Sequence, residues 1–159
     1  MSRWEAWAFG TLQLVLALTG GVYFYMKHVL RNEDPFAVVN HPWQSSMLAA
    51  HVVAAPLGLV LFGIVLRSHI LKKLTVNGRP GRWTGWTSLV SFSAMALSGY
   101  LLQVVSSPAG LRAVMVAHVV TSAIFVLGYS AHLIAGWLFL RAPDLDEAPG
   151  NIESRPHVP

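Results

Sequence analysis

The chain of 159 residues contains no cysteine. This absence excludes disulfides, thiolate metal sites, iron–sulfur clusters and the covalent attachment of c-type haem through a C-x-x-C-H motif. A P-loop and the glycine pattern of a Rossmann dinucleotide site are missing as well. The chain therefore has no recognisable site for oxidising a substrate, and we expect it to be one subunit of a larger complex.

Charged residues are scarce: they make up 11% of the chain, whereas hydrophobic residues make up 54%. Such a chain has too few charges to cover a soluble surface. Its formal net charge is +4, but the basic residues lie in the connections between apolar blocks and do not alternate with aromatic residues along one face. We therefore expect no nucleic-acid partner.

Four apolar blocks are long enough to cross a membrane, which takes roughly 20 helical residues. In lipid only a helix satisfies the backbone hydrogen bonds of a single span, so the blocks are predicted to be helical. The sequence thus predicts an all-α integral membrane four-helix bundle over residues 1–142, with spans of about 7–26, 46–66, 86–105 and 113–140. The polar, proline-rich segment 143–159 is expected to be a flexible tail.

The distribution of basic residues predicts the topology. With four spans, both termini lie on one face, here called face A, together with the connection between the second and third spans; the opposite face is called face B. Face A carries eight basic residues, namely Arg3, Arg67, Lys72, Lys73, Arg79, Arg82, Arg141 and Arg155, and face B carries Lys27, Arg31 and Arg112. By the positive-inside rule face A is cytoplasmic, so both termini are expected there.

Four histidines, His51, His69, His118 and His132, lie in or beside the second and fourth blocks. An ionisable side chain in a membrane helix is costly and usually functional, and neutral imidazole is a strong ligand of haem iron. The separation of His51 and His69 in the sequence equals five whole α-helical turns, so we expect both on one face of the helix. The separation of His118 and His132 is shorter, about 40° short of four turns.

The two helices run in the same direction, so depth decides how the histidines pair. The sequence predicts two non-covalent haem b sites, with His51 and His118 as iron ligands near face B and His69 and His132 near face A. The two spacings correspond to about 27 Å and 21 Å, so a tilt or kink has to absorb about 6 Å. His69 lies beside Arg67 and Lys72, and an alternative places it among the lipid headgroups.

Small residues at the same two depths on the first and third helices would leave room for the porphyrins. Glycines occur there at Gly10 and Gly85 near face A and at Gly20, Gly21 and Gly99 near face B. Close helix packing explains membrane glycines equally well. For the anionic propionates, the expected partners are Arg82 and Arg67 near face A and Arg112 near face B.

These histidines resemble the ligands of the four-helix cytochrome b subunits that accompany bacterial formate dehydrogenases, nickel–iron hydrogenases and related oxidoreductases, the cytochrome b561-like superfamily. The resemblance covers about residues 7–140. His118 and His132 match the family's fourth-helix pair, and His51 matches the second-helix ligand of the outer haem. The family's remaining ligand lies on the first helix near its cytoplasmic end, where this chain has Trp4, Trp7 and Gln13 but no histidine. His69 would replace it, an arrangement that looks more like the cytochrome b of bc-type complexes.

The resemblance implies that the chain transfers electrons across a bacterial cytoplasmic membrane between the quinone pool and a redox partner. The implied partners are other subunits of a quinone-linked oxidoreductase complex, such as a multihaem cytochrome c, an iron–sulfur subunit, or a hydrogenase or dehydrogenase subunit, with membrane lipid around the chain.

Two other functions are compatible with the same histidines. A haem-free membrane anchor of a larger complex would use them only to join helices. A proton or metal transporter would use them as a relay, because chains of ionisable groups mark conduction paths in membranes. The transporter is the less favoured alternative, because none of the four predicted spans contains a carboxylate and no discontinuous helix is evident.

Overall fold

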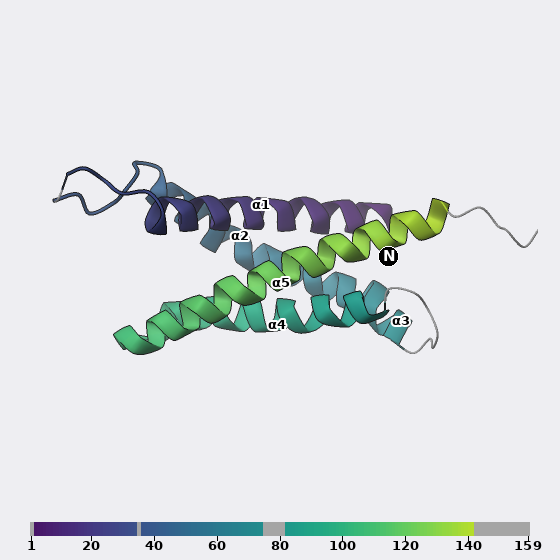
Figure 1. The fold of residues 1–159 in the computed structure, drawn as a ribbon. Coiled ribbons are helices and arrows are strands. Elements are labelled where there is room, and N and C mark those ends of the chain that lie inside the picture. The colour runs from purple at the N-terminus through teal and green to yellow at the C-terminus, as the bar shows by residue number, and fades with distance from the viewer. Residues whose placement is uncertain (1, 35, 75–81, 142–159) are drawn as a thin grey trace, which may run out of the picture.

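The computed structural model describes residues 2–34, 36–74 and 82–141, with the backbone alone at 73–74, 82 and 139–141. Every regular element in these ranges is helical (Figure 1). The elements are α1 (Arg3–His28), α2 (Gln44–Val65), the π-helix η1 (Leu66–Ile70), α3 (Leu71–Leu74), α4 (Arg82–Val104) and α5 (Pro108–Arg141). The predicted all-α class is confirmed, and the predicted tail lies outside the described residues.

Four helical segments are long and apolar enough to cross a membrane: Arg3–His28, Gln44–Ile70, Trp83–Val104 and Pro108–Leu138. They contain the four predicted blocks, apart from one or two residues at the ends of the third and fourth. Their composition is that of a multi-pass membrane protein. Many large apolar side chains are exposed along these helices, as expected for surfaces that face lipid.

Polar caps extend two of the helices beyond the apolar blocks. At the start of α1, the Ser2 hydroxyl accepts a hydrogen bond from the Glu5 backbone, and the Glu5 carboxylate accepts one from the Ser2 backbone. This capping box lets α1 begin before the apolar block. At the start of α5, Pro108 occupies the first helical position and Ser107 accepts from the backbone of Gly110, so α5 begins before the predicted residue 113.

The second helix continues past Arg67, where the apolar block ends. At Leu66 the helix changes from α to π, and the backbone N–H of Leu71 donates to the carbonyl of Leu66, five residues back. A residue in a π-turn rotates less about the axis than the 100° of an α-helix. The expectation that His51 and His69 are separated by five whole α-helical turns was therefore wrong, because His69 lies inside this π-helix.

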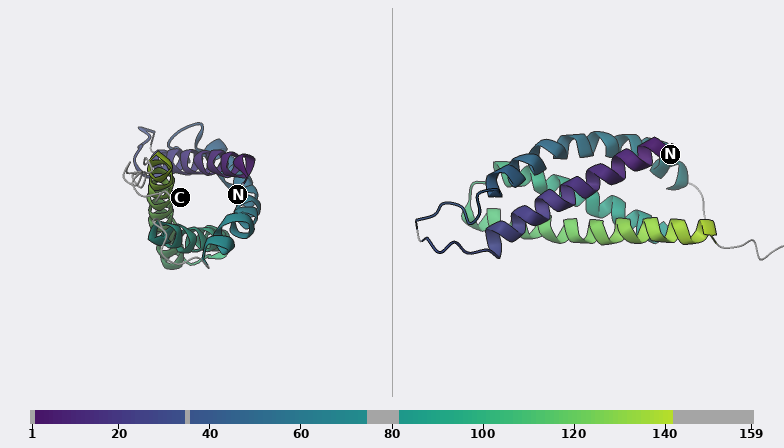
Figure 2. Two further views of the ribbon diagram at one scale, coloured as in Figure 1. Left: turned by 90° about the vertical axis from the view of Figure 1, so that its right-hand side faces the viewer. Right: turned by 90° about the horizontal axis from the view of Figure 1, so that it is seen from above.

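The long helices form two hairpins. Helix α1 packs along α2, and α4 packs along α5, whereas helices of different hairpins make few contacts with one another. Seen end-on in Figure 2, the four long helices outline a square. Each hairpin is therefore a packing unit, and the two units meet in a limited region.

That region is an aromatic cluster. Phe62 of the first hairpin stacks on Phe92 of the second with ring centroids 3.9 Å apart, and Phe9 lies 5.6 Å from Tyr129. Phe9, Phe92 and Phe125 are buried and form most of the core. Phe125 is seven residues from both His118 and His132, so this cluster joins the hairpins midway between the two histidine depths.

Candidate functional site

The structure brings His51 of α2 and His118 of α5 together across the two hairpins. Their ring centroids are 6.3 Å apart, and the ring planes are inclined by 81°. Both side chains are partly buried. The pairing expected from their depths is therefore present in the fold.

His69 and His132 form a second pair with the same spacing, 6.3 Å between ring centroids and 72° between ring planes. His69 comes from η1 and His132 from α5. The π-helix places more residues in one turn than an α-helix does, which offsets part of the mismatch between the two histidine spacings. The ring of His69 thus lies opposite His132.

The spacing in each pair matches two imidazoles on one metal ion. A metal–imidazole bond is about 2.0–2.1 Å long, and a ring nitrogen lies roughly 1.1 Å from the ring centroid, so two such ligands place their centroids roughly 6.2–6.4 Å apart. The 6.3 Å of both pairs lies in that range. A direct hydrogen bond between the rings would bring them closer than this.

Near face B, each imidazole is anchored to the other helix of its own hairpin. Nδ1 of His51 lies 3.0 Å from the carbonyl oxygen of Leu16 on α1 and 3.3 Å from the Thr19 hydroxyl. A carbonyl only accepts, so the Nδ1–H donates, and the neutral ring is left with an unprotonated Nε2. Within the described part of the chain, Nε2 of His51 has no hydrogen-bond partner.

His118 is anchored in the same way on the second hairpin. Its Nδ1 lies 3.0 Å from the carbonyl oxygen of Met95 on α4 and 3.3 Å from the Ser98 hydroxyl. Metal-ligating histidines commonly donate their second N–H to such a carbonyl, which sets the tautomer and the ring orientation. Both face-B imidazoles therefore have the protonation state and the support of a ligand pair.

Near face A the support differs. Nδ1 of His132 lies 3.2 Å from the hydroxyl of Thr84 on α4, and among the described residues no carbonyl is its partner. The ring of His69 is carried by the π-helix. The face-A pair thus has the spacing of the face-B pair but a different set of contacts behind the rings.

Glycines lie directly behind three of the rings. A Cβ added at Gly20 would lie 2.8 Å from Cε1 of His51, and one at Gly99 would lie 3.1 Å from Cε1 of His118. At Gly85 the corresponding distance to His132 is 3.8 Å, which is ordinary contact. Gly20 and Gly99 thus accommodate the imidazole rings against their helices, and their role in leaving room for porphyrin stays a prediction.

A hydroxyl residue followed by glycine marks each of these contacts, a signal that the sequence analysis missed. The dipeptides are Thr19-Gly20, Thr84-Gly85 and Ser98-Gly99. Thr84 and Ser98 have the same separation in the sequence as His118 and His132. The residue that precedes Thr19 by this same separation is Glu5. A carboxylate therefore occupies the position at which the repeat would place another hydroxyl.

The arginines expected near propionates have different surroundings. Arg67 lines a pocket with Glu5 and Ser68 on the seam between α1 and the second helix, and it is two residues from His69 and hence on another side of that helix. Arg112 is exposed near the start of α5. The side chain of Arg82 lies outside the described residues.

The described residues contain no group of three or more His, Asp or Glu side chains that could hold a metal ion on its own. Structural zinc sites use four protein ligands and catalytic ones usually three. Two imidazoles at each depth suit instead a metal whose other ligands come from a macrocycle.

Comparison of the chain with protein-family models, with curated proteins and with solved structures found no match.

Proposed function

We propose that the chain is a membrane b-type cytochrome that binds two haems without covalent attachment. In this proposal it carries electrons across a bacterial cytoplasmic membrane, between the quinone pool and another subunit of an oxidoreductase complex, with both termini in the cytoplasm. The observation that carries the proposal is the occurrence of two imidazole pairs, each with ring centroids 6.3 Å apart, at two depths of one bundle.

The donor set supports haem in particular. His51 and His118 would hold the group near face B, and His69 and His132 the group near face A, through imidazole nitrogens. When bound, haem iron supplies one-electron redox chemistry. The pairs are about 21 Å apart along α5, estimated from the spacing of its two histidines and the standard helical rise, so they lie at different levels of the membrane.

The chain's own residues prepare the ligands. The carbonyls of Leu16 and Met95 hold the Nδ1 protons of the two face-B rings. This fixes each ring as the tautomer whose Nε2 can bind metal, and it raises the basicity of the ligand. The aromatic cluster between the two depths holds the hairpins together there and excludes water.

A haem-free membrane anchor is the competing function, and one observation favours it. The Nδ1 hydrogen bonds of His51 and His118 join neighbouring helices within each hairpin, and such bonds stabilise membrane helix packing without any cofactor. They account for one nitrogen of each ring. They do not account for the approach of the rings of different hairpins at the same spacing twice.

A pyridine haemochrome assay on the purified full-length chain tests the proposal. We expect two haems b per chain and the low-spin spectrum of bis-imidazole iron. A folded, monodisperse protein that stays colourless after expression with excess haem would contradict the proposal and favour the anchor. One haem per chain would restrict the function to a single histidine pair.

A further inference from the structure

The seam between α1 and the second helix carries two hollows that follow one another along the helices. The first, of about 430 Å³, lies at the face-A end and is lined by Glu5, Ile64, Arg67, Ser68 and Lys72. The second, of about 600 Å³, is nearer the middle of the helices and includes Trp7, Ala8, Val15, Leu57, Val60 and Leu61. Ile64 is one helical turn from Val60 and Leu61, so the hollows are continuous in depth.

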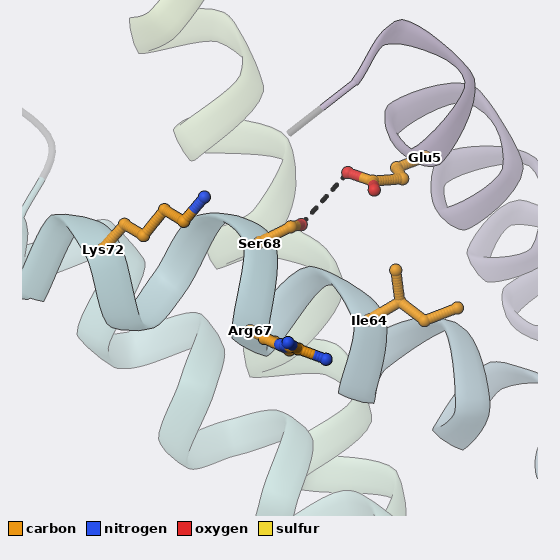
Figure 3. Close-up of a pocket in the computed structure, with 5 residues that line it drawn as sticks. All are labelled: Glu5, Ile64, Arg67, Ser68 and Lys72. Atoms are coloured by element: carbon orange, nitrogen blue, oxygen red, sulfur yellow. Dashed lines mark hydrogen bonds between the residues drawn. The ribbon is translucent and has the colours of Figure 1, made fainter.

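The face-A hollow is charged. Figure 3 shows Glu5 reaching from α1 to Ser68, with Lys72 and Arg67 on the same facing helix as Ser68. The Glu5 carboxylate accepts hydrogen bonds from the Ser68 hydroxyl at 3.0 Å and from the Ser2 backbone at 2.9 Å. Within the described part of the chain, the Arg67 guanidinium makes no hydrogen bond or ion pair. The lining side chains therefore comprise two cations and one carboxylate, a formal net charge that is positive.

The second hollow is lined almost entirely by hydrocarbon, from Ala8 and Val15 on one helix and from Leu57, Val60 and Leu61 on the other. A ligand with an anionic group in the face-A hollow and an apolar chain in the second hollow would therefore match the lining of both. Basic pockets between membrane helices at the cytoplasmic side are suited to anionic lipid headgroups. A phosphodiester pairs with arginine and lysine through charge-assisted hydrogen bonds, whereas a neutral quinone head gains little from two cations.

We propose that this seam binds one anionic phospholipid. Its phosphodiester lies between Arg67 and Lys72, and one acyl chain follows the groove between α1 and α2. The lipid ties the capped start of α1 to the π-helix. This site involves none of the histidine contacts, so it is independent of haem binding.

Native mass spectrometry of the full-length chain in detergent tests the headgroup part. We expect dioleoyl phosphatidylglycerol to be retained more strongly than dioleoyl phosphatidylcholine. Each lysine or arginine near an anionic headgroup raises the affinity for the lipid about five-fold. R67Q or K72Q should therefore lower phosphatidylglycerol retention about five-fold, and the double variant should lower it about 30-fold. The matched control R31Q/R112Q removes two exposed cations near face B and should change retention by less than two-fold.

The groove is tested separately. Ala8→Phe fills it, and we expect the variant to lose most of the preference for dioleoyl over dihexanoyl phosphatidylglycerol while its R67Q sensitivity remains. Equal retention of the two headgroups, the same loss in R31Q/R112Q, or an unchanged chain-length preference in Ala8→Phe would overturn the proposal. So would displacement of phosphatidylglycerol by equimolar ubiquinone-2, which would assign the seam to a quinone. Haem content does not enter these measurements. The lipid proposal can therefore fail while the proposed function stands, and the proposed function can fail while the lipid proposal stands.

Discussion

The two histidine pairs have the same ring spacing, but they are built differently. Near face B, His51 and His118 each have a backbone carbonyl at 3.0 Å and a hydroxyl at 3.3 Å from Nδ1, with a glycine behind the ring. Near face A, His132 has a hydroxyl partner, and His69 lies on a π-helix. The face-B pair thus rests on regular helix backbone repeated in two hairpins, whereas in the face-A pair His132 has a hydroxyl behind its ring and His69 is carried by a helical irregularity.

The largest expected effect comes from removing one histidine of either pair. His51→Ala should lower the haem content from two to one per chain, and His132→Ala should do the same with a different residual spectrum, because each removes one of two proposed iron ligands. Haem per chain by pyridine haemochrome measures both. His41→Ala, in the loop before α2, is the matched control and should retain two haems. Retention of two haems in His51→Ala would exclude His51 as a ligand.

Next in size is the effect of adding one residue at the π-helix. Inserting an alanine after Leu66 should rotate His69 by roughly 100° relative to His51, because a further helical residue turns the segment that follows it by one helical step. We expect loss of the face-A haem with retention of the face-B haem, measured by redox titration of the remaining spectrum. Loss of the face-B haem instead, in a protein that still folds, would show that the π-helix is not a device specific to face A.

Glycine substitutions compare the two levels directly. A Cβ at position 20 would meet the His51 ring at 2.8 Å, whereas one at position 85 would meet His132 at 3.8 Å. Gly20→Ala should therefore weaken the face-B haem by about 10- to 100-fold, the range typical of disturbed ligand support, and Gly85→Ala should leave both haems in place. Haem transfer to apomyoglobin measures the affinities. Gly21→Ala, with open space around its Cβ, is a neighbouring control.

The smallest expected effect is on redox potential. A hydrogen bond from Nδ1–H makes the ligand more basic and stabilises ferric over ferrous iron. Thr84→Val should raise the midpoint potential of the face-A haem by up to about 60 mV, the value of a ten-fold change in relative affinity for one electron. Ser98→Ala should shift the face-B haem less, because the Met95 carbonyl remains. A larger shift in Ser98→Ala would reverse this comparison.

Much of the fold could be predicted from block length and composition, but two local features could not. Helix α5 begins at Pro108 because Ser107 caps it, and hydropathy does not report caps. The π-turn at Leu66–Ile70 replaces one regular turn in a sequence with no proline or glycine in it. Its presence depends on what the helix packs against, which is information that a single sequence does not contain.

For the candidate site, the depths of the histidines predicted which rings meet, because spacing along a helix converts directly into height and direction. The partners behind the rings were not predicted. Leu16 and Met95 contribute only backbone carbonyls, and no side-chain pattern distinguishes such residues. The hydroxyl–glycine dipeptides carried a readable signal, but glycine near a membrane histidine also suits simple helix packing.

The sequence by itself determined four apolar helices and the approximate heights of their histidines, because a single span in lipid satisfies its backbone hydrogen bonds only as a helix and an α-helix has a constant rise. The tertiary structure decided how the longer histidine spacing of one helix matches the shorter spacing of another, which nitrogen of each imidazole is held, and where the two hairpins touch. These depend on contacts between segments far apart in the chain, and only packing brings those segments together.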